Sequence, residues 1–318
     1  MEKFIVRQSE ALHGTVRISG AKNAVLPILA ACLLTEEPCT ITNVPPLTDV
    51  LEMAELLKEF GAETSYDGLT ETIKICSETL SNQQAAEKNA CAMRASFLAA
   101  GPLLARCHQA ALPLPGGCPI GSRPVDLHLK GFSIMGAVHK LEHGVVELSA
   151  KNGLRGKRVY LDFPSVGATE NIMMAATLAK GTTTIENAAA EPEICDLADF
   201  LRKMGAEITG DGTDTIVIQG QKRLHGATHN VISDRIEAGT FMTAAAITGG
   251  DTCHCQIDRM QCQNRSDFVG TAGVPEGQTS SYTAENYALS RFSYGYAGVV
   301  HEFGSCHKGH QRYHGNGI

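Results

Sequence analysis

The sequence contains no tryptophan, and aromatic residues make up only 5% of its 318 residues. It also lacks an apolar run of about 18 residues, which a membrane-spanning helix would need. No apolar segment of signal-peptide length follows residues 1–7. An excess of positive charge is absent as well, because the formal net charge is −7. We therefore expect a cytoplasmic protein that neither enters a membrane nor binds nucleic acid in general.

The cysteines are numerous, but they indicate neither disulfides nor a metal site. Eleven cysteines in a long chain without a secretion signal are typical of reduced thiols, and Cys32 in an apolar run reads as a core residue. Near the C-terminus, Cys253-x-Cys255 and the run from Cys306 to His314 offer metal-ligand side chains, but their spacing matches no common zinc module. We predict no metal and no cofactor.

Two short patterns recur along the chain at an interval of about 70 residues. Leu-x-Gly followed by a short strand begins at Leu12, Leu154 and Leu224. Gly-Ala between a helix and a strand begins at Gly61, Gly136 and Gly205. Repeated units therefore begin near residues 12, 84, 154 and 224.

Each unit combines strands and helices in one order. In the first unit, a strand at 15–18 precedes a small-residue helix at 24–34, a strand at 39–42 and an amphipathic helix. Apolar residues at helical spacing mark that amphipathic helix: Val50, Met53, Leu56, Leu57 and Phe60. Its counterpart in the third unit follows Pro192 and carries Ile194, Leu197, Leu201 and Met204. The pattern predicts an α/β fold of repeated modules.

The fourth unit ends early, before its second strand and helix. It runs from Leu224 through a helix at 235–248 to residue 250. Residues 251–318 contain one leucine, Leu289, and five of the seven tyrosines, and no amphipathic period continues there. We expect this segment to be poorly packed or disordered, and the chain to be prone to aggregation.

A glycine- and proline-rich stretch at 112–127 carries a candidate reactive group, Cys118. Its composition indicates a loop, and Pro124 suits the first turn of the helix that follows. Arg123 and the helix N-terminus would both favour the thiolate of Cys118. The alternative is a surface thiol without a function.

Further polar residues lie where loops meet helices. Lys22 and Asn23 stand at a helix N-terminus, which offers free amide donors and a positive dipole. Arg94 is placed similarly in the second unit. Residues 165–167 form a similar loop-to-helix junction in the third unit but carry no charged side chain. Each position alone could be a solvated side chain or a plain helix cap. Together, Lys22, Arg94 and Arg123 suit a ligand that carries several negative charges.

Five motifs together resemble a known family. They are Ser-Gly-Ala-Lys-Asn-Ala at 19–24, Met-Arg-Ala-Ser at 93–96, Leu-Pro-Gly-Gly-Cys-Pro-Ile-Gly-Ser-Arg-Pro-Val-Asp-Leu at 114–127, Ser-Val-Gly-Ala-Thr at 165–169 and Asp-Arg-Ile-Glu-Ala-Gly-Thr-Phe at 234–241. Over residues 1–250 the chain resembles bacterial UDP-N-acetylglucosamine 1-carboxyvinyltransferases of the enolpyruvyl transferase family. The resemblance implies two domains, each an inside-out α/β barrel of three repeats.

The resemblance also implies domain boundaries. It places a first enolpyruvyl transferase domain at 20–232 and the remnant of an incomplete second domain at 1–19 plus 233–250. Residues 251–318 would form a non-family segment. Six repeats of this size would need about 420 residues.

The implied reaction moves the enolpyruvyl group of phosphoenolpyruvate onto the 3-hydroxyl of UDP-N-acetylglucosamine and releases phosphate, the first committed step of peptidoglycan synthesis. The resemblance assigns Cys118 as the proton donor and as the thiol that fosfomycin alkylates. It assigns Lys22 and Arg123 to the phosphate and carboxylate of phosphoenolpyruvate. It assigns the substrate-binding set to Lys22, Asn23, Arg94, Arg123, Pro124, Val125, Asp126, Leu127, Ser165, Val166 and Gly167. The two substrates are the expected partners, and no oligomeric state is indicated.

The C-terminal segment departs from the family. The family's aspartate base and its later phosphoenolpyruvate-binding arginines have no match here. Codons for residues 291–298, read one nucleotide forward, can encode the stretch around that aspartate, Ala-Phe-Pro-Thr-Asp-Met-Gln. We therefore interpret residues 251–318 as the product of a reading-frame shift near residue 251.

Two hypotheses about activity follow from the family and its missing parts. The chain is an active enolpyruvyl transferase, or it is a truncated, catalytically defective remnant that at most binds UDP-sugar. A transferase acting on shikimate 3-phosphate is a further alternative, but that family lacks the Pro-Gly-Gly-Cys loop.

Overall fold

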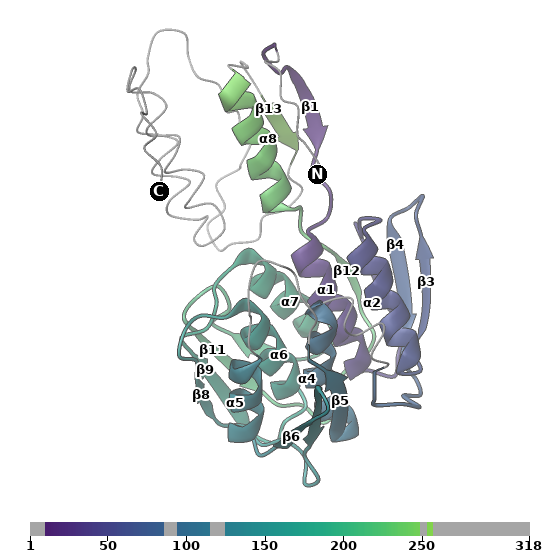
Figure 1. Ribbon diagram of the computed structural model, residues 1–318, viewed down its shortest axis with the longest axis vertical. Coiled ribbons are helices and arrows are strands. Elements are labelled where there is room, and N and C mark those ends of the chain that lie inside the picture. Colours follow the sequence, from purple (N-terminus) through teal and green to yellow (C-terminus); the bar gives the residue numbers. More distant parts are fainter. Residues whose placement is uncertain (1–9, 86–93, 115–124, 249–252, 257–318) are drawn as a thin grey trace, which may run out of the picture. The chain divides into compact units, whose positions relative to one another are not determined.

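The computed structural model describes residues 10–85, 94–114, 125–248 and 253–256 (Figure 1). Contacts divide the chain into two compact units. The larger is Ile18–Arg235, and the smaller includes, among the described residues, 10–17, 236–248 and 253–256.

The larger unit contains three successive α/β repeats and one further strand. The first repeat consists of α1 (Lys22–Ala31), the 3-10 helix η1 (Cys32–Leu34), β2 (Cys39–Thr42), α2 (Thr48–Glu59), β3 (Glu63–Asp67) and β4 (Thr72–Cys76). The second consists of the 3-10 helix η2 (Arg94–Ala99), α4 (Ala100–Cys107), β5 (Gln109–Pro113), α5 (Asp126–Ile134), β6 (Val138–Glu142) and β7 (Val145–Ser149). The third consists of β8 (Arg158–Tyr160), α6 (Val166–Ala176), β9 (Thr182–Glu186), α7 (Pro192–Lys203), β10 (Glu207–Thr209) and β11 (Thr215–Gln219), and β12 (Thr228–Asn230) follows.

The strands of this unit form three separate sheets, with the orders β12-β2-β4-β3, β5-β7-β6 and β8-β9-β11-β10. β12 pairs parallel with β2, as β8 pairs parallel with β9. The strand that begins the fourth repeat therefore completes the sheet of the first repeat. The predicted α/β fold is confirmed, and the sheets are not joined into one closed sheet.

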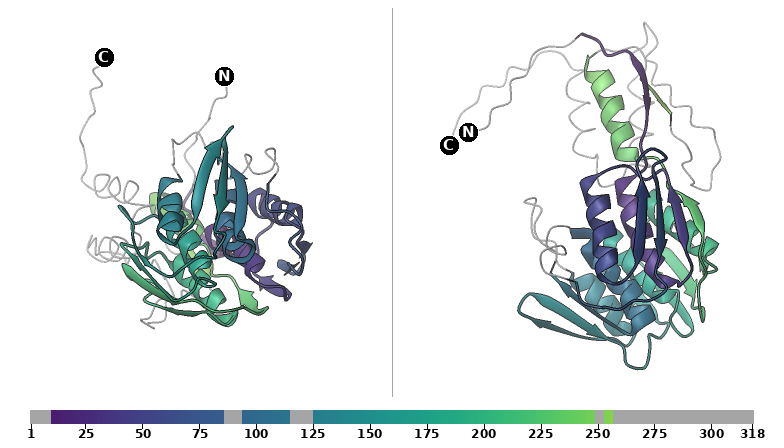
Figure 2. Two further views of the ribbon diagram at one scale, coloured as in Figure 1. Left: turned by 90° about the horizontal axis from the view of Figure 1, so that it is seen from below. Right: turned by 90° about the vertical axis from the view of Figure 1, so that its right-hand side faces the viewer.

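Three helices form the core of the larger unit. Residues 24–31 of α1, 100–105 of α4 and 168–176 of α6 are all buried. α4 contacts α6, and η2 contacts both α1 and α6. Seen from below, the three sheets lie on different sides of these helices (Figure 2, left). Most residues of these helices are small or aliphatic, as burial on every side favours, and α6 also buries Thr169, Glu170 and Asn171.

The recurring Gly-Ala pattern ends the second helix of each repeat. Gly61, Gly136 and Gly205 follow α2, α5 and α7 with φ of 104°, 99° and 98°. The next alanine donates its N–H to a carbonyl five residues back, as in Ala62 N to Leu57 O at 3.1 Å. This is a Schellman ending, in which the left-handed position favours glycine. The pattern thus ends each helix and directs the chain into the strand that follows.

The Leu-x-Gly pattern serves close packing at its second and third occurrences. A Cβ at Gly156 would lie 2.4 Å from Thr182 O, and a Cβ at Gly226 would lie 2.3 Å from Pro38 O. Both glycines therefore let the entering chain lie directly against the backbone where the next strand of the sheet begins.

The smaller unit pairs the two ends of the described chain. β1 (Gly14–Arg17) lies parallel to β13 (Cys253–Gln256), and α8 (Arg235–Thr248) precedes β13. The prediction that the fourth repeat ends before its second strand is therefore wrong for residues 253–256. Backbone groups alone make the ladder of a parallel pair, so this strand needs no apolar pattern. The predicted disorder of residues 257–318 falls outside the described residues.

Candidate functional site

Lys22 begins α1 on a tightly fixed backbone. Gly20 forms an antiparallel bridge with Ser233, so the two segments that connect the larger unit to the rest of the chain lie side by side. A Cβ at Gly20 would lie 1.8 Å from Asn43 O, which leaves room only for glycine. The Ser-Gly-Ala-Lys sequence therefore places Lys22 at one defined point.

The N-terminal turn of α1 presents a cation and an uncapped helix end. Lys22 Nζ lies 2.9 Å from Asp49 Oδ2 in the first turn of α2, and each side chain is 41% exposed. Asn23 is exposed. Ala21 occupies the N-cap position and has no side-chain acceptor, so the helix amides keep their attraction for an anion.

Arg94 begins η2, the start of the second inner helix, and its side chain lies outside the description. The Arg106 guanidinium at the end of α4 donates to Leu33 O and Thr35 O, each at 3.0 Å. Leu33 and Thr35 follow α1, so the carboxyl ends of α1 and α4 lie close together. At the other end of α4, the preceding helix η2 also contacts α1. The two helices therefore run in the same direction, with Lys22 and Arg94 at their amino ends.

Val125, Asp126 and Leu127 form the start of α5, with Val125 at the N-cap. Val125 and Leu127 are 6% and 8% exposed, whereas Asp126 is exposed. A ligand at this turn would therefore meet the backbone at 125 and 127 and the side chain at 126. Cys118, Arg123 and Pro124 lie outside the described residues.

Ser165, Val166 and Gly167 form the start of α6. Ser165 is the N-cap, and its Oγ accepts from Ala168 N at 3.4 Å. All three residues are partly buried. The predicted helix start is confirmed, and its serine satisfies one amide of the turn.

One residue that the sequence did not single out joins these turns. His128, in the first turn of α5, packs its ring at 88° against Phe97 of η2, with centroids 5.3 Å apart. A Cβ at Gly167 would lie 3.6 Å from His128 Nε2. Asn171 of α6 bonds His128 Nδ1 at 3.0 Å. The amino ends of η2, α5 and α6 thus gather around one imidazole.

A buried carboxyl lies one turn further along α6. Burial raises the pKa of Glu170 well above its ordinary value, and the charges of Glu193 and Glu191 raise it further. Glu193 in turn binds Arg235, with Nε 3.0 Å from Oε1. Among the described residues, Glu170 Oε1 has no hydrogen-bond partner. Glu170 is therefore best accommodated in its neutral form.

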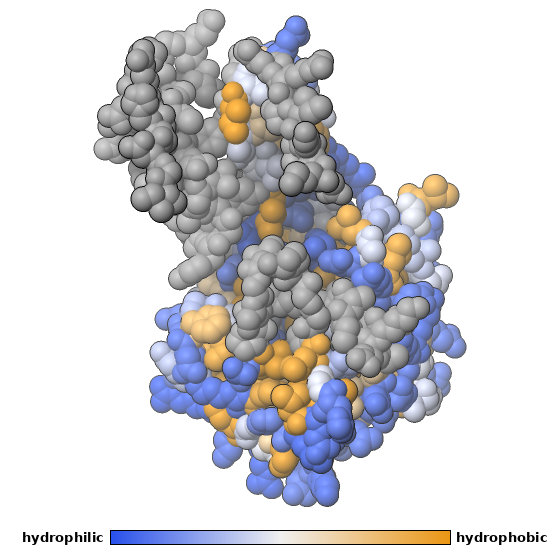
Figure 3. Space-filling view, viewed as in Figure 1, coloured by the Kyte–Doolittle hydropathy of each residue, from blue (hydrophilic) through white to orange (hydrophobic). Residues whose placement is uncertain are grey.

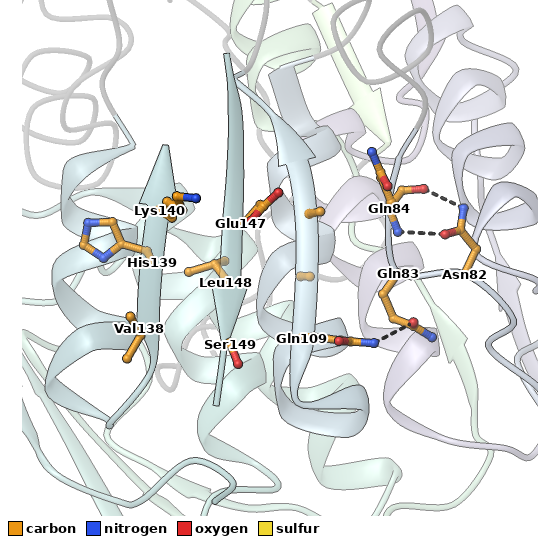
Figure 4. Close-up of a pocket in the computed structure, with 12 residues that line it drawn as sticks. Asn82, Gln83, Gln84, Gln109, Val138, His139, Lys140, Glu147, Leu148 and Ser149 are labelled. Carbon is orange, nitrogen blue, oxygen red and sulfur yellow. Dashed lines mark hydrogen bonds between the residues drawn. The ribbon is translucent and has the colours of Figure 1, made fainter. Parts of the chain in front are cut away.

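A surface hollow of about 420 Å³ lies elsewhere, beside the sheet β5-β7-β6 (Figure 4). It is lined by the segment 82–84, where Gln83 accepts a hydrogen bond from Gln109 of β5, and by strand residues such as Lys140 and Glu147. None of the predicted site residues lines it. In the space-filling view the surface of this unit is largely hydrophilic, with an apolar area between α5 and β5 (Figure 3).

The described residues contain no group of three or more His, Cys, Asp or Glu side chains that could hold a metal ion. Within the same ranges, every helix is too short or too polar to cross a membrane.

Residues 6–271 match the family model described as EPSP synthase (3-phosphoshikimate 1-carboxyvinyltransferase). The chain belongs to the EPSP synthase family. Among similar proteins, UDP-N-acetylglucosamine 1-carboxyvinyltransferase 1 of Caldanaerobacter subterraneus subsp. tengcongensis is 57% identical over 249 residues, 78% of this chain and 59% of that protein. UDP-N-acetylglucosamine 1-carboxyvinyltransferase 2 of Carboxydothermus hydrogenoformans is 54% identical over 251 residues, 79% of this chain and 59% of that protein.

Solved structures of an enolpyruvyl transferase and of an EPSP synthase agree with the fold. The enolpyruvyl transferase NikO from Streptomyces tendae has a TM-score of 0.66 at 25% identity, over 74% of this chain and 56% of that one. An EPSP synthase from Acinetobacter baumannii has a TM-score of 0.61 at 20% identity, over 77% and 55% of the two chains. The chain spans 59% of the length of the two curated relatives that it matches.

Proposed function

We propose that this chain carries the nucleotide-sugar domain of a UDP-N-acetylglucosamine 1-carboxyvinyltransferase. The reaction would take place in the cytoplasm as the first committed step of peptidoglycan synthesis, which supports cell shape and division. The observation that carries the proposal is a set of helix amino ends. Lys22 begins α1 and Arg94 begins η2, and His128 lies between the amino ends of α5 and α6. The names of relatives at 54% and 57% identity support the choice of substrate.

The proposed domain spans 20–232. We propose that its three sheets and inner helices correspond to the inside-out barrel that the resemblance implies. Residues 1–19 and 233–250 would belong to a second, incomplete barrel.

The proposed substrates are anions, and their groups suit the site. Lys22 and Arg123 would bind the phosphate and carboxylate of phosphoenolpyruvate. The turns at 125–127 and 165–167, with Asn23 and Arg94, would hold the UDP-sugar, whose diphosphate suits helix amino ends. We assign no cofactor to the reaction.

In the proposed reaction, the 3-hydroxyl of the sugar gives up its proton to a base and its oxygen adds to C2 of phosphoenolpyruvate, while the Cys118 thiol delivers a proton to C3. The C2–O bond to phosphate then breaks, phosphate leaves with the bonding electrons, and C3 loses a proton to restore the vinyl group. Fosfomycin would alkylate the same thiol.

A binding-only chain is the second candidate, because the chain spans 59% of the length of its relatives. Transferases of this kind close around their substrates, and an incomplete second domain would prevent closure. This chain would then hold UDP-sugar without turnover.

A phosphate-release assay separates the candidates. Release that requires both phosphoenolpyruvate and UDP-N-acetylglucosamine, and that is lost in Cys118→Ala, supports the transferase. Saturable UDP-sugar binding without release supports the binding-only chain. Release with shikimate 3-phosphate in place of the UDP-sugar would contradict both.

A further inference from the structure

Asn171 is fully buried in α6 and forms hydrogen bonds through its amide oxygen and both amide hydrogens. Its Oδ1 accepts from Gly101 N at 2.7 Å, and its Nδ2 donates to Phe97 O at 2.8 Å. A backbone N–H can only donate and a backbone carbonyl can only accept, so these two bonds fix which end of the amide is nitrogen.

The second hydrogen of Asn171 Nδ2 points at His128 Nδ1, 3.0 Å away. An amide nitrogen can donate hydrogen bonds but cannot accept them. His128 Nδ1 must therefore be the acceptor, so it carries no proton. The ring proton of a neutral His128 then sits on Nε2. This tautomer follows from two backbone groups and one amide, without any assumption about a ligand.

The Nε2 edge of His128 faces the amino end of α6. An ideal Cβ at Gly167 would lie 3.5 Å from Cε1 and 3.6 Å from Nε2, which is ordinary contact distance. The T-shaped contact with Phe97 holds the plane of the ring. His128 Nε2 thereby lies beside the turn at 165–167, one of those that the proposed function gives to the UDP-sugar.

We propose that Asn171 is a positioning residue, which holds His128 as the Nε2–H tautomer so that it donates a hydrogen bond to a phosphate oxygen of the nucleotide. The ligand part of this inference rests on the proposed function. Asn171 itself does not touch the ligand. It sets the proton position and orientation of a ring that belongs to another helix.

The ring nitrogens of His128 test the proposal directly. Nitrogen NMR of the full 318-residue chain with labelled histidine, with His128 assigned by loss of its signals in His128→Phe, should show Nδ1 unprotonated and Nε2 protonated. Asn171→Asp replaces the donor with an acceptor, so a proton should appear on Nδ1. Asn187→Asp is the matched control, because Asn187 Nδ2 donates to Leu161 O at 2.8 Å in the third repeat. It should leave the His128 signals unchanged. A proton on Nδ1 of the wild-type ring would overturn the proposal, as would an unchanged ring in Asn171→Asp.

Titration with UDP tests the ligand part. UDP should shift the Nε2 signal, and His128→Phe should weaken UDP binding by about tenfold, as expected for loss of one charge-assisted hydrogen bond. Asn171→Leu should weaken it by a similar factor, and the double variant should lose little more. Additive losses would show that the two residues act separately and would overturn the proposal. No UDP binding by the wild-type chain would overturn the proposed function and the ligand part, and the tautomer then decides the role of Asn171 alone.

Discussion

Glu170→Gln should change how the stability of the larger unit depends on pH. Glu170 is 3% exposed, and burial, followed by the charges of Glu193 and Glu191, raises its pKa well above the ordinary 4.5. Glutamine has nearly the same shape but no proton to lose. The variant therefore isolates the contribution of this one ionisation.

The sign follows from proton counting. Below pH 4.5 both the folded and the unfolded chain hold the proton, and its stabilising contribution is fully present. At pH values between 4.5 and the raised pKa of the folded state, only the unfolded chain releases the Glu170 proton. The free energy of unfolding then falls by about 1.4 kcal/mol for each pH unit. The contribution is lost completely once the pH has risen through the folded-state pKa.

Urea unfolding followed by circular dichroism at several pH values from 4.5 upward measures the effect. The free energy of unfolding of Glu170→Gln, relative to that of the wild type, should increase by about 1.4 kcal/mol per pH unit within that window. Glu207→Gln, on the exposed face of β10, is the control and should run parallel to the wild type. Parallel curves for Glu170→Gln and the wild type would refute the assignment of a buried neutral carboxyl.

Four further outcomes are expected. Gly20→Ala should destabilise the chain by about 1–3 kcal/mol in urea unfolding, because its Cβ would lie 1.8 Å from Asn43 O; unchanged stability would contradict that packing. Gly136→Ala, where φ is 99° and nothing lies within 4 Å of the added Cβ, should cost about 1–2 kcal/mol from backbone strain alone, and a neutral effect would contradict the Schellman assignment. Asp49→Asn should leave stability within about 1 kcal/mol, since the pair with Lys22 is 41% exposed, and should tighten phosphoenolpyruvate up to about fivefold in calorimetry; weaker binding would contradict the role given to Lys22. Sequencing the gene should reveal a family-like frame one nucleotide forward beneath codons 251–318, and its absence would remove the frame-shift interpretation.

The repeat could be predicted from sequence because each marker performs a local task. Gly61 and its counterparts end helices by φ values that glycine adopts easily, and Val50, Met53 and Phe60 lie on one buried helix face. Helix periodicity and turn chemistry depend on neighbours within a few residues, so they are visible in the chain itself.

The pairing of repeats could not be predicted in the same way. β12 completes the sheet of the first repeat through pairs such as His229 with Ile41, nearly 190 residues apart. β13 was missed because the segment after Thr248 changes composition, whereas its pairing with β1 is made by backbone. Neither signal is local.

The sequence identified the site residues at the loop-to-helix junctions, but it did not identify His128 and Asn171, which lie behind them. Lys22 and Ser165 stand at helix starts that sequence alone identifies. His128 directly follows the predicted run ending at Leu127, so extending that run by one helical residue would have found it. Asn171, 43 residues away, reads as an ordinary helix residue until the fold brings it to the ring.

Calorimetric titration of the 318-residue chain with UDP-N-acetylglucosamine tests the central claim most directly. The account predicts saturable binding at one site, displaced by UDP and weakened by His128→Phe, with no binding of shikimate 3-phosphate. Binding of shikimate 3-phosphate in the absence of any binding of the UDP-sugar would contradict it.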